Sequence, residues 1–483
     1  MPESADLSAR RPVLLWLRRD LRLTDHPALA AAIATARPVI PVFVHDETVE
    51  ALGAAAKWRL GLSVADLAAQ LAGQGSRLIL RRGPALAVIR ALLVETGAAA
   101  VYWSRGHDPA AIARDTAVKA ALKDEGIDAV SHPGALLAEP WEVTTAQGGF
   151  YRVYTPFWKA LRAKGVDAPL PAPDRLPAPP VWPESDRPED WRMGRAMNRG
   201  ASVLLPWQQV GESAALDRLR HFIGEDLDAY ADDRDRMDLP ATSGLSENLA
   251  WGEISPRTIW HAVWPAVLEG CRGADKFLSE LAWRDFAWHL LFHSPHLATA
   301  NWREGWDGFP WRGDNPDAEA WRRGRTGEPV VDAAMREMYV TGRMHNRARM
   351  IVASYLTKHL LTDWRVGQAW FADCLTDWDP AANAMGWQWV AGSGPDAAPY
   401  FRIFNPQTQA DRFDPAQAYR GRWLAEGKHD PSPEAILFFD AIPRRWGLSP
   451  RDNIPLPLIS LSAGRQRALD AYATGKPGNA DVG

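Results

Sequence analysis

The chain has 483 residues, too many for one ordinary hydrophobic core, so two domains are expected. Hydrophobic residues make up 46% of it and charged residues 24%, which excludes an intrinsically disordered protein. The net charge of −4 gives no argument for nucleic-acid binding, but it does not exclude a local basic face. The only two cysteines, Cys271 and Cys374, exclude a disulfide framework and a thiolate metal site.

The apolar pattern disfavours both secretion and membrane insertion. Residues 1–12 are polar and charged and lack the apolar core of a signal peptide. The best candidate for a membrane span, residues 28–44, is interrupted by Arg37, Pro38 and Pro41. The scarcity of cysteine fits a reducing compartment. We therefore expect a cytoplasmic protein with no membrane segment.

Residues 10–140 alternate short apolar runs with alanine-rich helical stretches. The candidate strands are 13–17, 39–44, 78–80 and 99–103, and helical spacing covers 28–36, 57–71, 84–96 and 110–123. Strands that alternate with helices predict an α/β domain with a parallel sheet and right-handed crossovers. The segment Gly73-Gln74-Gly75 lacks the third glycine of a dinucleotide-binding loop and precedes a strand where that loop should follow one. A Rossmann dinucleotide enzyme is therefore disfavoured.

The rest of the chain divides into a linker and a helical domain. Residues 141–212 are expected to form a proline-rich interdomain linker, because prolines recur between 165 and 195 and prevent regular structure. From 213 to 483 the pattern is helical, most clearly over 277–293 and 330–361. The chain contains 24 tryptophans, and more than half of them follow Trp251.

Two segments of the helical part bring polar and apolar side chains onto one face. Glu280 and Trp283 are three positions apart, and Arg284 could pair with Glu280. Asn346 and Met350 are four positions apart on another helix. Each pattern also has a plainer interpretation: a surface ion pair beside a packed aromatic, and a methionine in the core. Spacing alone does not decide between a binding site and ordinary packing.

Two aspartates, Asp377 and Asp379, flank Trp378. They could cap a helix or lie in a loop, or one of them could be the buried partner of Arg349. No histidine stands at ligand spacing from either aspartate, so no metal site is expected.

The segment 383–406 is harder to explain by packing alone. Trp387 and Trp389 flank a glutamine, and a glycine-rich turn and an aromatic–arginine stretch follow. Such a composition suits a flat ligand with an anion nearby, although tryptophans are also common in cores and interfaces.

Residues 377–406, together with 280–284 and 344–350, resemble the photolyase/cryptochrome family, and within it the cyclobutane pyrimidine dimer photolyases. Residues 15–25 resemble the first strand and loop of that family. The N-terminal half, including residues 57–60 and 103–108, resembles a bacterial, class III-like subgroup close to plant cryptochromes. The resemblance implies an N-terminal α/β domain with a parallel five-stranded, Rossmann-like sheet and an all-α FAD-binding domain.

The resemblance also implies the cofactors. A U-shaped FAD, active as the reduced anion, is expected in the helical domain, and 5,10-methenyltetrahydrofolate is the expected antenna. The residues that would contact the FAD are Tyr230, Thr242, Ser243, Gly244, Leu245, Ser246, Phe277, Arg284, Asn346, Arg349, Asp377, Asp379 and Asn383. Asn383 would face flavin N5, where a neutral amide is typical of repair enzymes and plant photoreceptors have an acid.

The implied reaction is light-driven repair of pyrimidine dimers in DNA, in which excited reduced FAD passes an electron to a dimer flipped out of the helix. The lesion pocket would be formed by Glu280, Trp283, Asn346, Met350 and Trp389. Electrons would reach oxidised FAD through Trp311, Trp364 and Trp387. DNA phosphates would meet Arg234, Arg347 and Arg402. We expect a monomeric deoxyribodipyrimidine photo-lyase with no obligatory protein partner.

Two alternatives stay open within the same family. One is a cryptochrome-type blue-light receptor, and the other is a (6-4) photolyase. Asn383, the set Glu280, Asn346 and Met350, and the short tail after Ile459 favour dimer repair over the receptor. The pair Asn346 and Met350 also argues against the (6-4) enzyme, which has a histidine-bearing version of this helix.

Some positions depart from the family pattern. Arg343 stands where an aromatic residue is usual, and Gly244 replaces an arginine of the FAD loop. Ala384 and Met385 replace a pair that is more often polar or glycine.

Overall fold

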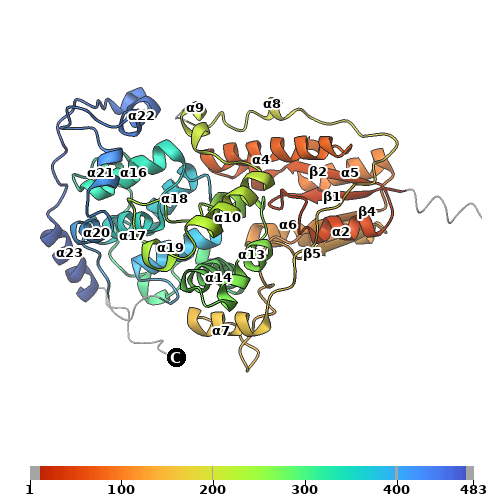
Figure 1. Cartoon of the computed structure of the whole chain (residues 1–483), viewed down its shortest axis with the longest axis horizontal. Helices are drawn as coiled ribbons and strands as arrows, with labels where there is room; N and C mark the ends of the chain where they lie inside the picture. Colours follow the sequence, from red (N-terminus) through yellow and green to blue (C-terminus); the bar gives the residue numbers. More distant parts are fainter. Residues whose placement is uncertain (1–10, 198–199, 397–400, 475–483) are drawn as a thin grey trace, which may run out of the picture.

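The computed structural model describes residues 11–197, 200–396 and 401–474. Its first half is built on a five-stranded parallel sheet (Figure 1). The strands are β1 (Val13–Leu17), β2 (Val39–His45), β3 (Ile79–Arg82), β4 (Ala100–Ser104) and β5 (Asp128–His132), in the order β3-β2-β1-β4-β5. Val13 at the start of β1 lies opposite Val39 and Ala100. The α/β architecture predicted from the sequence is confirmed.

Helices cover both faces of this sheet, which explains why β1 is apolar at every position and fully buried. On one face, Leu15 and Leu17 pack with residues of α2 (Pro27–Ala34) and α4 (Ala54–Gly73). On the other face, Leu14 and Trp16 pack with α5 (Ala85–Thr96) and α6 (Pro109–Asp124). A short helix, α3 (Glu47–Glu50), follows β2.

At the usual ligand crevice of such a sheet, an arginine contacts the helical half of the chain. Open α/β sheets bind ligands at the carboxyl ends of the strands, where the strand order reverses. Here the position lies between β1 and β4. Arg19, just after β1, crosses to the helical half and donates to the carbonyl oxygen of Trp378, 3.4 Å away. Its guanidinium also lies 4.9 Å from the ring centroid of Trp251. Residues 73–75 also lack the third glycine of a dinucleotide-binding loop.

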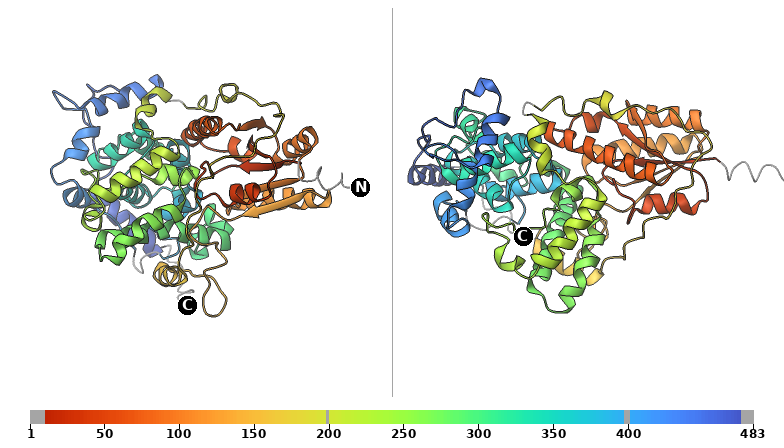
Figure 2. Two further views of the ribbon diagram at one scale, coloured as in Figure 1. Left: turned by 45° about the vertical axis from the view of Figure 1, so that its right-hand side comes forward. Right: turned by 45° about the horizontal axis from the view of Figure 1, so that its top comes forward.

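The segment 141–212, expected to be a linker, contains a helix that the sequence did not predict. This helix, α7 (Tyr154–Lys164), lies beside α14 (Arg272–His293) (Figures 1 and 2). Tyr154, Phe157 and Leu161 are buried at helical spacing in the same core as α14. Residues 165–187 form neither helix nor strand, and the short helices α8 (Pro188–Trp191), α9 (Ala201–Leu204) and η1 (Leu205–Trp207) follow.

The second half of the described chain is helical, as predicted (Figure 2). Its elements are α10 (Glu212–Glu225), α11 (Tyr230–Asp233), α12 (Ser246–Trp251), α13 (Pro256–Leu268), α14, η2 (Pro295–Ala298), η3 (Glu304–Trp306), α15 (Pro316–Arg322), α16 (Pro329–Thr341), α17 (Asn346–Ser354), η4 (Tyr355–His359), α18 (Trp364–Cys374), α19 (Pro380–Ala391), α20 (Pro406–Phe413), α21 (Ala418–Trp423), α22 (Pro433–Ala441), η5 (Arg444–Trp446) and α23 (Leu461–Thr474). Helix α19 packs against α14, α17 and α18 and is central to this half. No helix in the described ranges is long and apolar enough to cross a membrane.

Buried ion pairs join the two halves. Arg59 on α4 pairs with Glu253 at 2.8 Å, and both side chains are completely buried. Asp25, before α2, pairs with Arg257 on α13 at 2.5 Å. Removing one member of such a pair leaves an uncompensated buried charge. We call these two ion pairs the seam. They hold the sheet and the helical half together through specific charges as well as apolar contacts.

Candidate functional site

An ion pair lies where α17 meets the start of α19. Arg349 Nη2 lies 2.7 Å from Asp377 Oδ2, and Arg349 Nε donates to the carbonyl oxygen of Met344 at 2.8 Å. Two residues later, the Asp379 side chain accepts from the backbone N–H of Ala382 at 2.9 Å and caps α19. Asp377 is therefore the partner of Arg349, and Asp379 is the helix cap.

The second carboxylate oxygen of Asp379 faces α14. It accepts from Trp288 Nε1 at 3.0 Å, and Arg284 Nε lies 3.7 Å away. Arg284 also donates to the carbonyl oxygen of Ala135 at 2.9 Å. One turn into α19, buried Asn383 donates from Nδ2 to the carbonyl oxygen of Asp379 at 3.0 Å, which fixes the amide.

The expected pairing of Arg284 with Glu280 is wrong. Glu280 pairs instead with Arg234 at 2.9 Å and with Lys276 at 2.7 Å. Glu280 and Arg284 are at i and i+4, but the Arg284 guanidinium lies 3.7 Å from Asp379 and 3.8 Å from Asp285, which are both buried. The one signal for Lys276 as the helical partner of Glu280 is its i, i+4 spacing.

Glu280 and the start of α17 are connected by the two residues that follow α11. Arg234 binds Glu280, and the adjacent Asp235 binds Arg347 at 2.5 Å. The side chain of His345 caps α17 by accepting from the backbone N–H of Arg347 at 3.1 Å. Burial lowers the pKa of His345 to about 4, which keeps the ring neutral and able to accept. Asn346, the first residue of α17, is exposed, and Met350 one turn later is half-buried.

The two tryptophans assigned to the substrate pocket are both half-buried. Trp283 on α14 stacks on Tyr154, with ring centroids 3.7 Å apart and an interplanar angle of 11°. Trp389 on α19 donates from Nε1 to the carbonyl oxygen of Asp396 at 3.1 Å. The Arg402 guanidinium lies 5.4 Å from the Trp389 ring. Sequence reasoning missed Tyr154, which lies in the segment expected to be a linker.

The other three tryptophans lie on adjoining elements. Trp387 and Trp364 are buried, and Trp311 is partly exposed. The Trp387 ring packs so closely on α18 that a Cβ at Gly367 would come 2.1 Å from it. Trp364 begins α18, and the preceding residue, Asp363, donates from its backbone N–H to Arg312 O at 2.8 Å. All three tryptophans lie in or against the same hydrophobic core.

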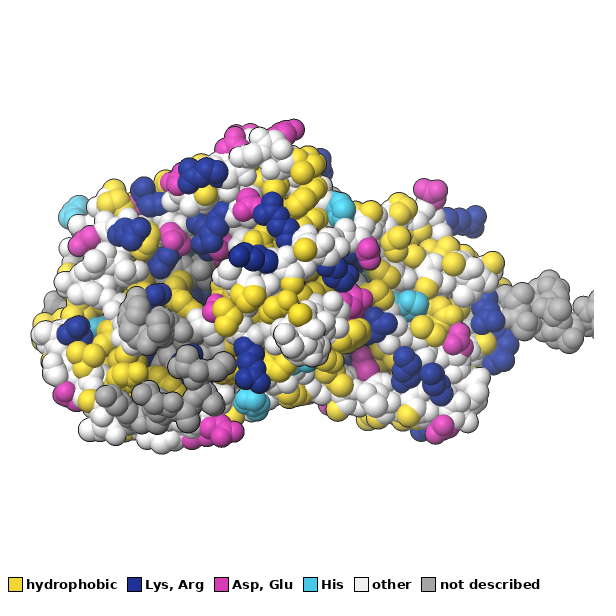
Figure 3. Space-filling model, turned by 90° about the horizontal axis from the view of Figure 1, so that it is seen from below, with side chains coloured by type: hydrophobic (Ala, Val, Ile, Leu, Met, Phe, Trp, Pro, Cys, Tyr) yellow, Lys and Arg dark blue, Asp and Glu magenta, His cyan; other side chains and the backbone are white. Residues whose placement is uncertain are grey.

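Tyr230 and Phe277 are buried and meet edge to face at 5.3 Å. Leu245 is buried and Ser243 is half-buried. Thr242, in the loop before α12, and Ser246, the first residue of α12, are exposed. Of the basic candidates, Arg234 and Arg347 are already paired with carboxylates. Figure 3 shows Lys and Arg side chains over the helical part of one face, between exposed hydrophobic side chains. Residues 397–400 of the segment 383–406 lie outside the described ranges.

Comparison with known proteins decides the family. A model described as DNA photolyase matches residues 13–176, and one described as the FAD binding domain of DNA photolyase matches residues 277–474. The deoxyribodipyrimidine photo-lyase of Agrobacterium fabrum is 44% identical over 476 residues, which cover 96% of this chain and 98% of that protein. The crystal structure of a bacterial class III photolyase from Agrobacterium tumefaciens is 44% identical, covers 97% of this chain and 98% of its own, and has a TM-score of 0.88. This chain belongs to the photolyase/cryptochrome family.

The relatives of this chain also include proteins named cryptochromes. Cryptochrome-1 of Arabidopsis thaliana is 33% identical over 485 residues, which cover 95% of this chain and 70% of that protein. The helical half of the chain is a FAD-binding domain of the photolyase kind.

The side chains of the site fit FAD. Asp377 Oδ1 and Arg284 Nε are buried and have no hydrogen-bond partner among the described residues. Leaving such atoms unpaired costs about 1–3 kcal/mol each. A flavin carries ring N–H and carbonyl groups that would complete both of them.

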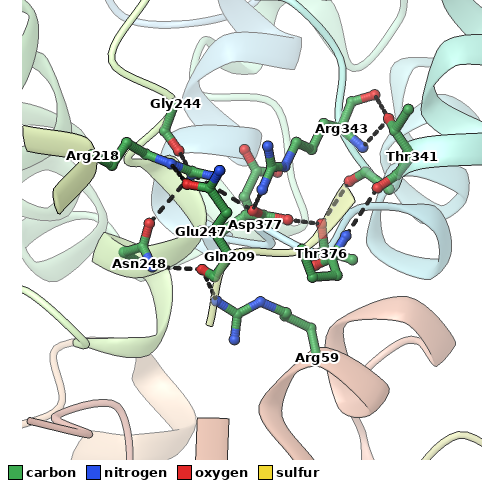
Figure 4. A network of polar contacts seen from close by, with 12 residues as sticks. Arg59, Gln209, Arg218, Gly244, Glu247, Asn248, Thr341, Arg343, Thr376 and Asp377 are labelled. Atoms are coloured by element: carbon green, nitrogen blue, oxygen red, sulfur yellow. Dashed lines mark hydrogen bonds and ion pairs between the residues drawn. The ribbon is translucent and has the colours of Figure 1, made fainter. Parts of the chain in front are cut away.

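Figure 4 shows how the chain accommodates two departures from the family pattern. Gly244 has φ +63°, a conformation that favours glycine, and its carbonyl oxygen accepts from Arg218. A Cβ at Gly244 would lie 3.4 Å from this guanidinium, so Arg218 fills the space beside the loop. Arg343 pairs with the completely buried Glu247, which also accepts from the Thr376 hydroxyl. An aromatic at 343 would leave Glu247 with less positive charge nearby.

The positions Ala384 and Met385 differ in burial. Ala384 is completely buried in the core that α19 shares with α14, where a polar side chain would need a partner. Met385 is partly buried against the same core.

Proposed function

We propose that this protein uses light and reduced FAD to repair cyclobutane pyrimidine dimers in DNA, as a deoxyribodipyrimidine photo-lyase. The observation that carries the proposal is the linkage from Glu280 through Arg234 and Asp235 to Arg347. These two ion pairs connect the acid on α14 with Arg347, the residue that follows Asn346 at the start of α17. Similarity to several proteins named deoxyribodipyrimidine photo-lyase supports the same function.

The protein residues would hold the cofactor at the junction of α14, α17 and α19. When bound, photoexcited reduced FAD supplies the electron that splits the dimer and receives it back afterwards. The Arg349–Asp377 pair would lie against the ring system, with Arg284 and Asp379 beside it. Asn383 presents a neutral amide in a fixed orientation, which adds no negative charge to a reduced flavin.

The remaining residues would recognise the lesion. Trp283 and Trp389 offer flat apolar surfaces for the fused pyrimidines. Glu280 and Asn346 can accept from and donate to the base edges, and Glu280 forms ion pairs with Arg234 and Lys276. Flipping the lesion out of the duplex costs a few kcal/mol, and the cost is lowest for a damaged pair that stacks poorly.

We also propose roles for the other predicted groups. Trp311, Trp364 and Trp387 would carry electrons inward from the surface to oxidised FAD. Arg234, Arg347 and Arg402 would contact phosphates near the pocket. A methenyltetrahydrofolate antenna would pass absorbed light to the flavin.

One assay tests the function. Purified, FAD-loaded, reduced protein is mixed with an oligonucleotide that contains a thymine dimer and is illuminated with blue light. The dimer should disappear in the light and persist in the dark control. An action spectrum with a band beyond the flavin absorption would support the antenna. If the flavin photoreduces normally while the dimer stays intact, the repair proposal fails and the receptor function suggested by the cryptochrome relatives is favoured.

A further inference from the structure

We infer that Tyr154 and Asp396 form a support behind the substrate pocket that fixes Trp283 and Trp389 relative to each other. The inference rests on the proposed repair function, because both tryptophans are assigned to the lesion there. Tyr154 is the first residue of α7, and Asp396 lies five residues after the end of α19. We call these two residues and their contacts the bridge.

Tyr154 holds Trp283 from behind. Its ring is parallel to the indole within 11° at 3.7 Å, so it covers one face of Trp283. Its hydroxyl donates to the carbonyl oxygen of Ser279 and lies 2.9 Å from Ser279 Oγ. Ser279 is one helical turn before Trp283, so Tyr154 spans the turn of α14 that carries the indole. Only the other face of Trp283 is left for a substrate.

Asp396 connects this pair to the second tryptophan. Burial raises the pKa of its carboxyl group, and the backbone N–H of Tyr154 beside it acts in the opposite direction by favouring the charged form. Val153, at the N-cap position of α7, makes no side-chain capping bond, so Asp396 supplies an acceptor and a negative charge to this helix end. The backbone carbonyl of Asp396 accepts from Trp389 Nε1 at 3.1 Å. One residue therefore contacts both sides of the pocket.

The backbone of Asp396 is itself constrained. Its φ of +51° lies in the left-handed region, which aspartate tolerates better than most residues other than glycine and asparagine. This turn directs the carbonyl toward Trp389 and the side chain toward α7. A pocket whose two flat walls keep one separation would favour a ligand of matching thickness, because stacking declines quickly as a gap opens.

The test compares Tyr154→Leu with the wild type. The change removes the ring behind Trp283, and we expect affinity for a thymine-dimer oligonucleotide to fall about three- to tenfold. Affinity for undamaged DNA, FAD content and the rate of flavin photoreduction should not change. Tyr154→Phe keeps the ring and should bind the dimer nearly as well as the wild type. Tyr151→Leu is the matched control, because Tyr151 is a half-buried neighbour that packs on Phe157 and not on Trp283.

A double-mutant comparison distinguishes a supporting role of Tyr154 for Trp283 from a general effect on protein stability. If Tyr154 acts through Trp283, the change Tyr154→Leu should have no further effect on dimer affinity in a Trp283→Leu background. Asp396→Gly gives a second route if Tyr154→Leu does not fold. It removes the cap of α7, suits the positive φ and keeps the carbonyl, and it should also weaken dimer binding.

The outcomes are distinct. Equal losses for damaged and undamaged DNA, additive effects of Tyr154→Leu and Trp283→Leu, or dimer binding unaffected by both Tyr154→Leu and Asp396→Gly would overturn the inference. Failure of the wild type to bind or repair a dimer would overturn the proposed function instead. If the wild type repairs dimers and the variants lose affinity for the dimer alone, both the inference and the proposed function are supported.

Discussion

At the scale of single residues, the tryptophans of the helical half differ in what surrounds their indole N–H groups. Trp389 and Trp364 donate to protein acceptors, whereas Trp387 Nε1 is buried without a partner among the described residues. Trp387 is also 3% exposed and packs edge-on against Phe371 at 4.9 Å. Packing therefore fixes the position of Trp387.

The change Trp387→Phe separates the two proposed uses of tryptophan. Phenylalanine fills much of the same space but is far harder to oxidise than indole. We expect light-driven reduction of oxidised FAD to slow by at least about tenfold, while chemically reduced protein repairs dimers at the wild-type rate. Absorbance of the flavin under illumination and a dimer assay measure the two quantities. Loss of both activities in a folded, FAD-loaded variant would contradict the tryptophan path.

The local features of the site were largely predictable, and its long-range contacts were not. The residue pattern offered a helix cap and a partner for Arg349 among Asp377 and Asp379 without deciding between them, and the structure gives the pairing to Asp377 and the cap to Asp379. Arg284, in contrast, donates a hydrogen bond to the backbone carbonyl of Ala135, which is 149 positions away in the sequence. The stack of Tyr154 on Trp283 joins residues from a segment expected to be a linker and from a helix. Hydrophobic periodicity is a property of one segment and does not indicate which distant segment it will contact.

At the scale of elements, α14 anchors the chain that leaves the sheet. Buried Asp285 accepts from the backbone N–H groups of Leu137 and Ala138, at 2.5 Å and 3.4 Å. These residues follow β5 and lead into the segment that carries α7. Burial raises the pKa of Asp285 to about 7, although the N–H donors and Arg284 favour the charged form.

This raised pKa gives a pH-dependent stability. Between about pH 4 and 7 the folded protein retains a proton on Asp285 that the unfolded chain releases, so unfolding becomes easier as pH rises through this range. Asparagine cannot ionise. We expect Asp285→Asn to compare more favourably with the wild type at pH 8 than at pH 5, in free energies of unfolding from denaturant titrations. A difference between the two proteins that does not vary with pH would contradict the assignment.

The elements themselves were predicted unevenly, for physical reasons. Strands β1, β2 and β4 were visible because they are continuous apolar runs buried on both faces. Helix α7 was missed because prolines on its C-terminal side dominate the composition of residues 141–212. Its buried stripe of Tyr154, Phe157 and Leu161 was present in the sequence but is short.

At the scale of the whole molecule, the two halves depend on each other. The fold class was predicted from alternation and helical periodicity and is confirmed. The seam was not predicted, because Arg59 and Glu253 look like ordinary surface charges in sequence and are 194 positions apart. Both are completely buried, and Asn248 also donates to Glu253 at 2.6 Å.

The change Arg59→Met tests this seam. It keeps an apolar side chain of similar length but leaves the Glu253 carboxylate buried with less compensation. Breaking such a pair costs about 3–5 kcal/mol. We expect a loss of this size in the free energy of unfolding, measured with urea. Arg187→Met is the control, since Arg187 pairs with Asp190 on the surface and should matter little. Equal stability of the two variants would show that the pair does not hold the halves together.

The seam can form only late in protein synthesis, because the partners of each ion pair are far apart in the sequence. Asp25 is made early, but Arg257 follows 232 positions later, and Glu253 follows Arg59 by 194. At about 5–20 residues per second, a ribosome takes roughly 10–50 s to supply these partners. During that wait the nascent sheet carries charges whose burial is incomplete. The amino-terminal half is thus expected to be the vulnerable part of the chain during synthesis, and to acquire its full resistance to proteases only when α12 and α13 have emerged.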